Sequence, residues 1–338
     1  MVEQLELQKR KIILKLNGVK KYFPIKSGLL RRVQNHVKAV ESVNLELYEG
    51  ESLGVVGESG CGKSTLGRAI LGLEPLTEGK ISFRDEEIQN LKRKEKLRFV
   101  KEMQMIFQDP FASLDPRQRV GDALSEVFSI HTNMGARERK EAVLKLLGEV
   151  GLKEEHYDRY PHEFSGGQRQ RIGIARAIAL NPSFIICDEA VSALDVSVQA
   201  QVLKLLKTLQ EKYHLSYMFI SHDLGVVRYF CNRVLVMYLG NTVELAEVEE
   251  LFKEPLHPYT QALLSAIPRP SVNTKVQRVR LQGDLPNPAN PPTGCPFHTR
   301  CPVVKDICKT EKPQWEEYTS GHFVACHYAG TSIVSGEV

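Results

Sequence analysis

The feature that most constrains this chain is a glycine-rich loop set between an apolar strand and a helix. Residues 52–57 (SLGVVG) have the pattern of a buried strand, and residues 63–73 have that of a helix. The loop between them, Gly57-Glu-Ser-Gly-Cys-Gly-Lys-Ser-Thr65, matches G-x-x-x-x-G-K-[ST]. Consecutive amides of such a loop converge on an anion, and the following helix directs its positive end to the same point. The pattern predicts an α/β fold that binds phosphate groups.

The side chains of this loop fit the chemistry of a nucleotide polyphosphate. Lys63 is a cation with the reach for β- and γ-phosphates, and the Ser64 hydroxyl can ligate Mg²⁺. The alternative is a glycine-rich turn without a ligand, but the strand before it and the helix after it favour the phosphate site. The predicted nucleotide-binding residues of the loop are Ser59, Gly60, Cys61, Gly62, Lys63, Ser64 and Thr65.

Composition excludes several other classes of protein. The chain has 338 residues, with 45 Lys and Arg against 41 Asp and Glu, so its formal net charge is only +4. Nucleic-acid-binding domains usually carry a larger and more concentrated basic excess. The 42% apolar and 25% charged residues are ordinary for a globular protein. Without a run of eighteen apolar residues or an apolar N-terminal core, we expect neither a membrane-spanning helix nor a secretory signal.

A second apolar strand, residues 183–189 (SFIICDE), ends in two acids. Open α/β sheets bind ligands at the carboxyl ends of their strands. Asp188 is expected to hold Mg²⁺, and Glu189 to polarise the water that attacks the γ-phosphate. Surface acids after strands are common, so this pair becomes informative only together with the glycine-rich loop.

A third motif, Ser165-Gly-Gly-Gln168, opens a helix. Ser165 with Gln168 three residues later forms a capping box, which alone is only a helix start. The two bare glycines add a second anion-binding helix N-terminus to the chain. One ATP does not need two such sites from one subunit, so we expect a dimer in which Ser165, Gly167 and Gln168 face the γ-phosphate held by a partner.

The remaining pattern completes an α/β texture. Helical sequence dominates residues 115–180, and residues 196–213 place apolar residues on one helical face. Strands are predicted at 12–17, 43–48 and 216–222, and a hairpin at 233–246 bent at Gly240-Asn241.

Over residues 12–268 these motifs resemble the ATP-binding-cassette (ABC) transporter ATPases. Phe164–Gln168 is similar to their signature motif, with Phe where Leu is usual, at a position that packs rather than binds. The resemblance implies a P-loop ABC ATPase cassette: a mixed sheet core plus a helical subdomain at about 110–180. It also implies ATP and Mg²⁺ as ligands, with Ser64, Gln108 and Asp188 around the metal.

The same resemblance assigns roles to three further residues. Gln108 would be the Q-loop glutamine beside Mg²⁺ and the attacking water, and it would report to membrane subunits. His222 would be the switch histidine at the γ-phosphate; otherwise it is a surface residue at a strand end. Phe23 would stack on adenine; otherwise it is a core aromatic. Residues 192–195 (SALD) are similar to the D-loop, which crosses the dimer seam.

Two stretches narrow the resemblance to the dipeptide/oligopeptide importer ATPases, in particular the second, "F"-type, subunit. They are residues 108–117 (QDPFASLDPR) and 257–268 (HPYTQALLSAIP). This resemblance implies a peripheral protein on the cytoplasmic face of the cell membrane. Its partners would be a second ABC ATPase subunit (or a second copy in isolation), two permeases and, indirectly, an extracytoplasmic peptide-binding protein, with no nucleic acid. Nickel-chelate cargo and a permease-free ATPase acting on nucleic acid are the alternatives.

The C-terminal part differs in texture from the rest. We expect an ABC ATPase domain over 1–255 and a small irregular Cys/Pro-rich extension over 256–338. Six prolines between Leu285 and Pro302 exclude a long helix or a central strand there, because proline lacks the amide donor.

Four cysteines of the extension, Cys295, Cys301, Cys308 and Cys326, have the spacing C-x₅-C-x₆-C-x₁₇-C. In a reducing compartment such a cluster favours a metal site over disulfides. All-thiolate ligation suits Zn²⁺ or an iron–sulfur cluster. Resemblance to the tails of this group favours a [4Fe–4S] cluster, with zinc second and disulfides or free thiols third. His298, His322 and His327 lie nearby in sequence, either as ligands or as exposed neighbours.

Overall fold

The computed structural model describes residues 11–27, 32–109, 114–267, 279 and 281–333. Residues 110–113 of the importer-like stretch and Pro268 therefore lie outside the described residues. The chain divides into two compact units, which we describe separately. The first comprises Met1–Lys11, Tyr48–Glu51 and Asn90–Ile220, and the second Ile12–Leu47, Ser52–Gln89 and Ser221–Val338. Among the described residues, no helix combines the length and apolar character needed to cross a membrane.

The first unit combines three parallel strands with a helical region. Strand β7 (Phe184–Asp188) lies between β6 (Met103–Ile106) and β8 (Ser216–Ile220), and every residue of β7 and β8 is buried. Continuous apolar runs of this kind are typical of parallel strands. The helices are α3 (Arg93–Glu102), α4 (Val120–His131), α5 (Ala136–Glu149), α6 (Gly166–Ile178) and α7 (Val196–Tyr213), with short 3₁₀ turns at Glu154–Asp158 and Pro161–Glu163.

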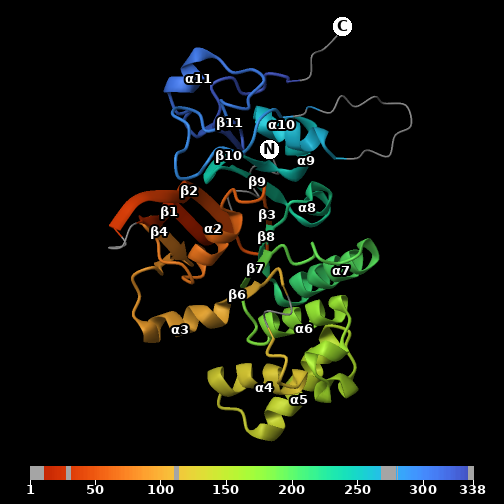
Figure 1. Ribbon diagram of the computed structural model, residues 1–338. Helices are drawn as coiled ribbons and strands as arrows, with labels where there is room; N and C mark the ends of the chain where they lie inside the picture. Colours follow the sequence, from red (N-terminus) through yellow and green to blue (C-terminus); the bar gives the residue numbers. More distant parts are fainter. Residues whose placement is uncertain (1–10, 28–31, 110–113, 268–278, 280, 334–338) are drawn as a thin grey trace, which may run out of the picture. The chain divides into compact units, whose positions relative to one another are not determined.

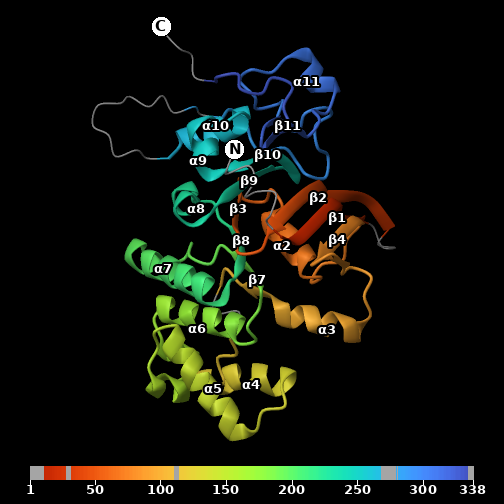
Figure 2. The same cartoon turned by 180° about the vertical axis from the view of Figure 1, so that it is seen from behind.

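The helical region of this unit packs through apolar stripes. Helices α4 and α5 lie side by side (Figures 1 and 2), and each buries one face. Leu124 and Phe128 come from α4, and Val143 and Leu147 from α5. The predictions of helical structure after residue 115 and of a helix over 196–213 are confirmed.

The second unit contains the strand that leads into the glycine-rich loop. Strand β3 (Ser52–Val56) is followed by that loop and by α2 (Lys63–Ile70), as predicted. β3 pairs in parallel with β9 (Arg233–Tyr238), which pairs antiparallel with β10 (Asn241–Glu247). A separate sheet has the order β2-β1-β4-β5. Its strands are β1 (Ile12–Ser27), β2 (Arg32–Tyr48), β4 (Glu78–Phe83) and β5 (Glu86–Glu87).

The hairpin between β9 and β10 turns one residue earlier than predicted. Asn241 pairs with Tyr238, so the two-residue loop is Leu239-Gly240 rather than Gly240-Asn241. Both loop residues have positive φ, 47° at Leu239 and 78° at Gly240. Such hairpins need positive φ at both central positions, which glycine tolerates and leucine does not favour. The Asn241 amide group instead donates to the Leu239 carbonyl oxygen at 2.8 Å and closes the turn.

The C-terminal extension has regular elements that the sequence did not predict. Strand β12 (His322–Val324) pairs with β10, and β11 (Glu316–Thr319) pairs with β12, both antiparallel. The helices of the extension are α10 (Pro258–Ser265) and α11 (Asp306–Thr310), and they follow α8 (Leu224–Phe230) and α9 (Val248–Lys253) in the chain. The proline-rich residues 281–305 form neither helix nor strand, as their proline content requires. β11, α10 and α11 are labelled in Figure 1.

One buried carboxylate, that of Glu244, bonds to backbone or side-chain groups of two other segments of this unit. The Glu244 side chain of β10 is fully buried and accepts hydrogen bonds from the amides of Leu256 (2.7 Å) and His257 (2.9 Å). Nε2 of His322 on β12 donates to the same carboxylate at 2.8 Å. Buried charges persist when they are paired and hydrogen-bonded in this way. Glu244 therefore joins a core strand, the start of α10 and an extension strand.

The His322 imidazole faces two carboxylates, because its Nδ1 lies 3.4 Å from Glu250. Burial disfavours the charged ring. The hydrogen bond that His322 donates to Glu244 and the charges of both glutamates outweigh that effect and raise the pKa of His322 above its ordinary value of 6.5. Since this pKa is higher in the folded chain than in the unfolded chain, the stabilisation is complete below about pH 6.5. It is lost as the pH rises through the folded-state pKa.

We predict that H322Q lowers the free energy of unfolding by about 2 kcal/mol at pH 6, where a charged hydrogen bond is removed. The difference from the parent chain should shrink at pH 8.5. Thermal unfolding midpoints across this pH range measure the effect, with H36Q, an exposed histidine on β2, as the control. A difference that grows toward pH 8.5 would contradict the protonated pair.

Candidate nucleotide site and four-cysteine pocket

The phosphate-binding loop of the second unit is closed around Lys63. The ammonium donates to the carbonyl oxygens of Gly57 (2.8 Å) and Glu58 (3.0 Å) and lies 3.7 Å from the Cys61 sulfur. Lys63 is only 5% exposed, so its long side chain is fixed inside the loop. Gly62 has φ +103°, and a Cβ there would collide with the Ala39 carbonyl oxygen. Glycine at this position therefore lets the loop pass against a neighbouring strand.

The other predicted loop residues are arranged by depth. Ser59 and Gly60 are exposed at the tip, while Cys61 is buried. Ser64 and Thr65 are half-buried in the first turn of α2. Hydroxyl and amide groups at the start of a helix are suited to binding phosphate oxygens.

The acidic strand end lies in the first unit. Asp188 ends β7 with 3% exposure. Glu189 follows with φ +48°, a left-handed conformation that is uncommon for a non-glycine residue. Its amide donates to the Ile220 carbonyl oxygen (3.0 Å), and its own carbonyl accepts from the Ser192 hydroxyl (2.9 Å). These bonds hold the backbone in the left-handed turn that ends the strand.

The structure brings together two of the predicted catalytic residues of this unit. The Gln108 side-chain amide donates to the Glu189 carboxylate at 2.9 Å, although 81 residues separate them. Gln108 follows β6, the strand next to β7, so both side chains come from adjacent strand ends. A glutamine that donates a hydrogen bond to a carboxylate fixes the orientation of that carboxylate. In this orientation the carboxylate can accept a proton from water.

The Ser165 motif has the capping geometry expected from sequence. The Ser165 hydroxyl accepts from the Gln168 amide (3.3 Å), and the Gln168 side chain accepts from the Ser165 amide (3.0 Å). Ser165 and Gly166 are exposed at the start of α6. Phe164 is 3% exposed and packs edge-on against the His156 ring at 5.2 Å, in agreement with a packing role. Its replacement of leucine leaves the polar face of the motif unchanged.

His222 and Phe23 belong to the second unit. His222 is exposed just after the end of β8, next to Asp223, which caps α8 by accepting from the Gly225 amide at 2.8 Å. Phe23 is half-buried on β1, with the Lys21 ammonium 4.6 Å from its ring centre. Contact of His222 with a γ-phosphate and stacking of Phe23 on adenine stay predictions.

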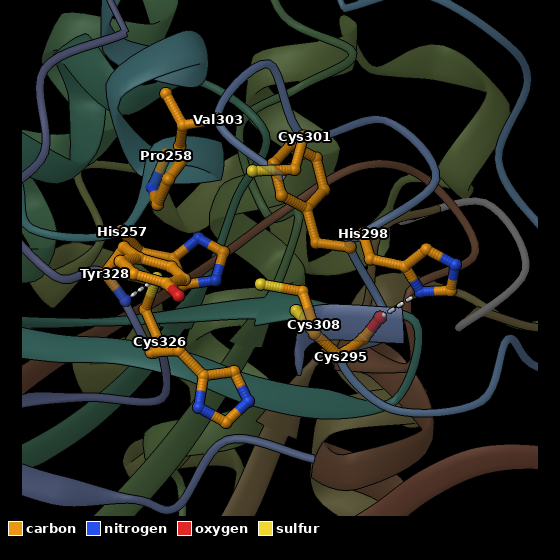
Figure 3. A pocket seen from close by; sticks show the side chains of 11 residues that line it. His257, Pro258, Cys295, His298, Cys301, Val303, Cys308, Cys326 and Tyr328 are labelled. Atoms are coloured by element: carbon orange, nitrogen blue, oxygen red, sulfur yellow. Dashed lines mark hydrogen bonds between the residues drawn. The ribbon is translucent and has the colours of Figure 1, made fainter. Parts of the chain in front are cut away.

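The four late cysteines line one pocket of the second unit (Figure 3). Cys295 and Cys308 are buried, and Cys301 and Cys326 are half-buried. The Cys295 amide donates to the Cys308 carbonyl oxygen (2.8 Å), which ties two cysteine loops together. The remaining wall is formed by His257, Pro258, Phe297, His298, Val303, His327 and Tyr328.

The nearby histidines have other partners. The His298 ring is turned outward in Figure 3, and its Nδ1 bonds the Cys295 carbonyl oxygen at 2.9 Å. His327 bonds the Glu311 carbonyl oxygen (3.0 Å), and His322 is the partner of Glu244 described above. His322 does not line the pocket, and sequence analysis did not single out His257, which does.

Electrostatics couple the thiols of the pocket. Burial raises the pKa of Cys295 to about 11 and that of Cys326 to about 12, and the charges of neighbouring cysteines add to the effect. Metal ligation requires thiolates, which a bound cationic centre would favour here. Within the described ranges, no group of three or more His, Cys, Asp or Glu side chains is placed to hold a metal ion. The structure thus provides a shared cysteine pocket but does not confirm a metal site.

Comparison with known proteins agrees with this combination of motifs. A family model described as ABC transporter matches residues 40–192, and one described as Oligopeptide/dipeptide transporter, C-terminal region, matches residues 243–308. The chain belongs to the ABC transporter ATPases, in their oligopeptide/dipeptide branch. The family predicted from the sequence motifs is confirmed.

Relatives match over nearly their whole length. The oligopeptide transport ATP-binding protein AppF of Bacillus subtilis is 57% identical, covering 93% of this chain and 97% of that protein. The dipeptide transport ATP-binding protein DppF of Haemophilus influenzae is 47% identical, covering 96% and 98%. Among solved structures, the ATP-binding cassette MJ0796, a dimer bound to ADP and Pi, matches with TM-score 0.62 and 29% identity, over 70% of this chain and 99% of that one. The predicted cassette fold is confirmed.

We predict opposite effects for two alanine substitutions in α6. A Cβ at Gly167 would overlap the Val198 Cγ1 atom, whereas a Cβ at Gly173 would meet nothing within 4 Å. G173A should stabilise the chain by about 0.5–1 kcal/mol through helix propensity. G167A should destabilise it by about 1–3 kcal/mol through overpacking. Denaturant unfolding of both variants measures the difference, and equal effects would show that α6 and α7 do not approach so closely.

Proposed function

We propose that this chain is the ATP-hydrolysing subunit of a membrane importer for oligopeptides or dipeptides. The observation that carries the proposal is the presence, in one chain, of a phosphate-binding loop closed around Lys63 and of an exposed Ser165-Gly-Gly helix start. The family model over residues 243–308 and the names of the AppF and DppF relatives support peptide cargo.

In this proposal Lys63 and the loop amides bind the β- and γ-phosphates of ATP. Ser64, Gln108 and Asp188 supply the oxygen ligands that would hold Mg²⁺, whose charge would neutralise the phosphate oxygens. Glu189 accepts a proton from the attacking water, and the Gln108 hydrogen bond orients its carboxylate. His222 contacts the γ-phosphate, and Phe23 stacks on adenine.

The subunits act in pairs. Ser165, Gly167 and Gln168 of one subunit complete the nucleotide site of the other, so that the γ-phosphate joins the two. ATP favours the closed pair only as far as it binds that pair better than the open one, and hydrolysis removes this preference. The dimeric cassette bound to ADP and Pi supports such an assembly.

We further propose that the partner is a second, different ABC ATPase subunit and that the pair works beneath two permeases on the cytoplasmic face of the membrane. An extracytoplasmic peptide-binding protein delivers the cargo. Exposed apolar side chains support a docking surface on the first unit. Leu97 and Val100 lie on α3, and Ile130 lies near the end of α4. The Lys101 ammonium links these helix ends by donating to the His131 carbonyl oxygen at 2.8 Å.

We also propose that the four-cysteine pocket holds a [4Fe–4S] cluster. Four sulfurs around one zinc ion would lie within about 4 Å of one another, given a Zn–S distance of about 2.3 Å. A cluster instead takes one sulfur at each of four irons, so its ligands stand farther apart. Four thiols that line one pocket could supply the ligands of either centre, and the resemblance of the tail to those of this group favours the cluster. The Tyr328 amide, which donates to the Cys326 sulfur at 3.4 Å, adds a bond that favours a ligating thiolate. When bound, the cluster would crosslink the proline-rich loops, and cysteine side chains would do the ligating.

We expect E189Q to lower the turnover of ATP by at least about a hundredfold, because the general base is lost. ATP binding should be retained, since the phosphate-binding loop is unchanged. Turnover is measured as phosphate release and binding by equilibrium titration, with E141Q on the exposed face of α5 as control. Retained turnover in E189Q would refute the role of Glu189.

Iron analysis and absorbance of anaerobically purified protein test the cluster. We expect about four irons per chain and a brown colour. C308A should lose most of the iron, whereas C231A, a cysteine outside the pocket, should retain it. A colourless protein with one zinc per chain, or iron unaffected by C308A, would overturn the assignment.

A further inference from the structure

The phosphate-binding loop contains a carboxylate, Glu58, that forms an ion pair with a residue outside the loop. Glu58 directly follows Gly57, and its carbonyl oxygen accepts from the Lys63 ammonium. A carboxylate next to a triphosphate site repels the ligand, because like charges at close range disfavour each other even near a surface. Some cation must therefore offset Glu58 if the loop is to bind anions well.

The C-terminal extension provides that cation. The Arg300 guanidinium donates through Nη1 to Glu58 Oε2 (2.7 Å) and through Nη2 to Glu58 Oε1 (3.0 Å). The Arg300 side chain is only 9% exposed. Bidentate hydrogen bonds of this kind fix the orientation of the carboxylate in addition to compensating its charge. The hydrogen bond with Glu58 raises the pKa of Arg300, which is charged at every relevant pH.

The C-terminal extension also contacts the backbone of the phosphate-binding loop. The Glu58 amide donates to the Tyr259 hydroxyl at 2.8 Å, and Tyr259 belongs to α10. Tyr259, Tyr238 and Phe297 form a cluster of rings with centres 4.8–5.4 Å apart. Arg300 lies over the Tyr238 ring at 5.9 Å, and its amide donates to the Phe297 carbonyl oxygen. Since Phe297 also lines the cysteine pocket, packed residues run from that pocket to the phosphate-binding loop.

We propose that Arg300 is a positioning residue for ATP binding, which neutralises Glu58 and fixes the phosphate-binding loop from the C-terminal extension. This inference rests on the proposed ATPase function and deepens it. Arg300 contacts no substrate in this account; it acts through Glu58. Its loss would leave an uncompensated carboxylate beside the triphosphate, so the affinity for ATP would fall while the catalytic residues stay in place.

The test is a set of charge-neutralising substitutions in the intact chain, with ATP binding, KM and kcat as readouts. R300Q should raise the Kd and KM for ATP about tenfold, as expected for a half-buried like charge at short range, with kcat changed less than twofold. The double variant E58Q/R300Q should return both constants close to those of the parent, because the repelling carboxylate is gone. R300K keeps the positive charge but cannot form the bidentate pair with Glu58. Its Kd and KM for ATP should therefore lie between those of the parent and those of R300Q.

The outcomes separate the two proposals. If the parent chain hydrolyses ATP and R300Q binds ATP normally, the role of Arg300 is wrong and the ATPase function stands. If R300Q weakens binding and E58Q/R300Q does not restore it, Arg300 acts through packing and the charge argument fails. Iron content, expected to be equal in all variants, shows whether the neighbouring Cys301 site is intact. A loss of iron in R300Q alone would assign its effect to the pocket and overturn the inference.

Discussion

The buried Glu244 carboxylate is the interaction on which the second unit depends. It is placed on β10, two strands from the β3 strand that leads into the phosphate-binding loop. By accepting from the amides that start α10 and from His322 on β12, it attaches the extension to that sheet at two points. A carboxylate without these donors would be too costly to bury. The core and extension of this unit therefore need each other to satisfy one charge.

Several of the predicted phosphate- and metal-binding residues lie at the ends of regular elements. Lys63 and Ser64 are the first residues of α2, Ser165 is the N-cap of α6, and Asp188 is the last residue of β7. Element ends leave backbone amides without internal partners, and these amides can bind anions or cap with side chains. The rigid strand or helix behind each end fixes its position. This explains how small polar groups can be held accurately without a large dedicated scaffold.

Local rules account for what the sequence predicted well. The glycine-rich loop, the Ser165 capping box and the helix over Val196–Tyr213 depend on neighbours within a few residues, which a sequence displays directly. Phe164 packs as the family resemblance implied. Continuous apolar runs also predicted β7 and β8, because both strands are buried on two faces.

Contacts between distant residues account for what was missed. The family resemblance placed Gln108 and Glu189 at the same water, but their direct hydrogen bond across 81 residues was not predicted. The pair of Arg300 and Glu58, 242 residues apart, was not predicted at all. Strands β11 and β12 are only four and three residues long, and β11 is fully exposed, so no alternation marks them. Pairing partners fix such strands, not propensity. The hairpin turn shifted by one residue because the Asn241 side chain closes Leu239-Gly240 instead of occupying the turn.

The proline-rich segment of the extension is ordered without regular secondary structure. Residues 281–305 have no helix or strand, so separate backbone bonds such as that from Cys295 to Cys308 take the place of a regular ladder. Side-chain contacts add to this order: Asn35 on β2 donates to the Ala289 carbonyl oxygen at 2.8 Å, and Phe297 packs in the ring cluster. β12 in turn covers β10, which would otherwise offer a free edge for pairing. A proline-rich segment ordered by side chains can place Arg300 against Glu58 only as firmly as those anchors hold, so the order of the tail and the charge of the phosphate-binding loop are linked.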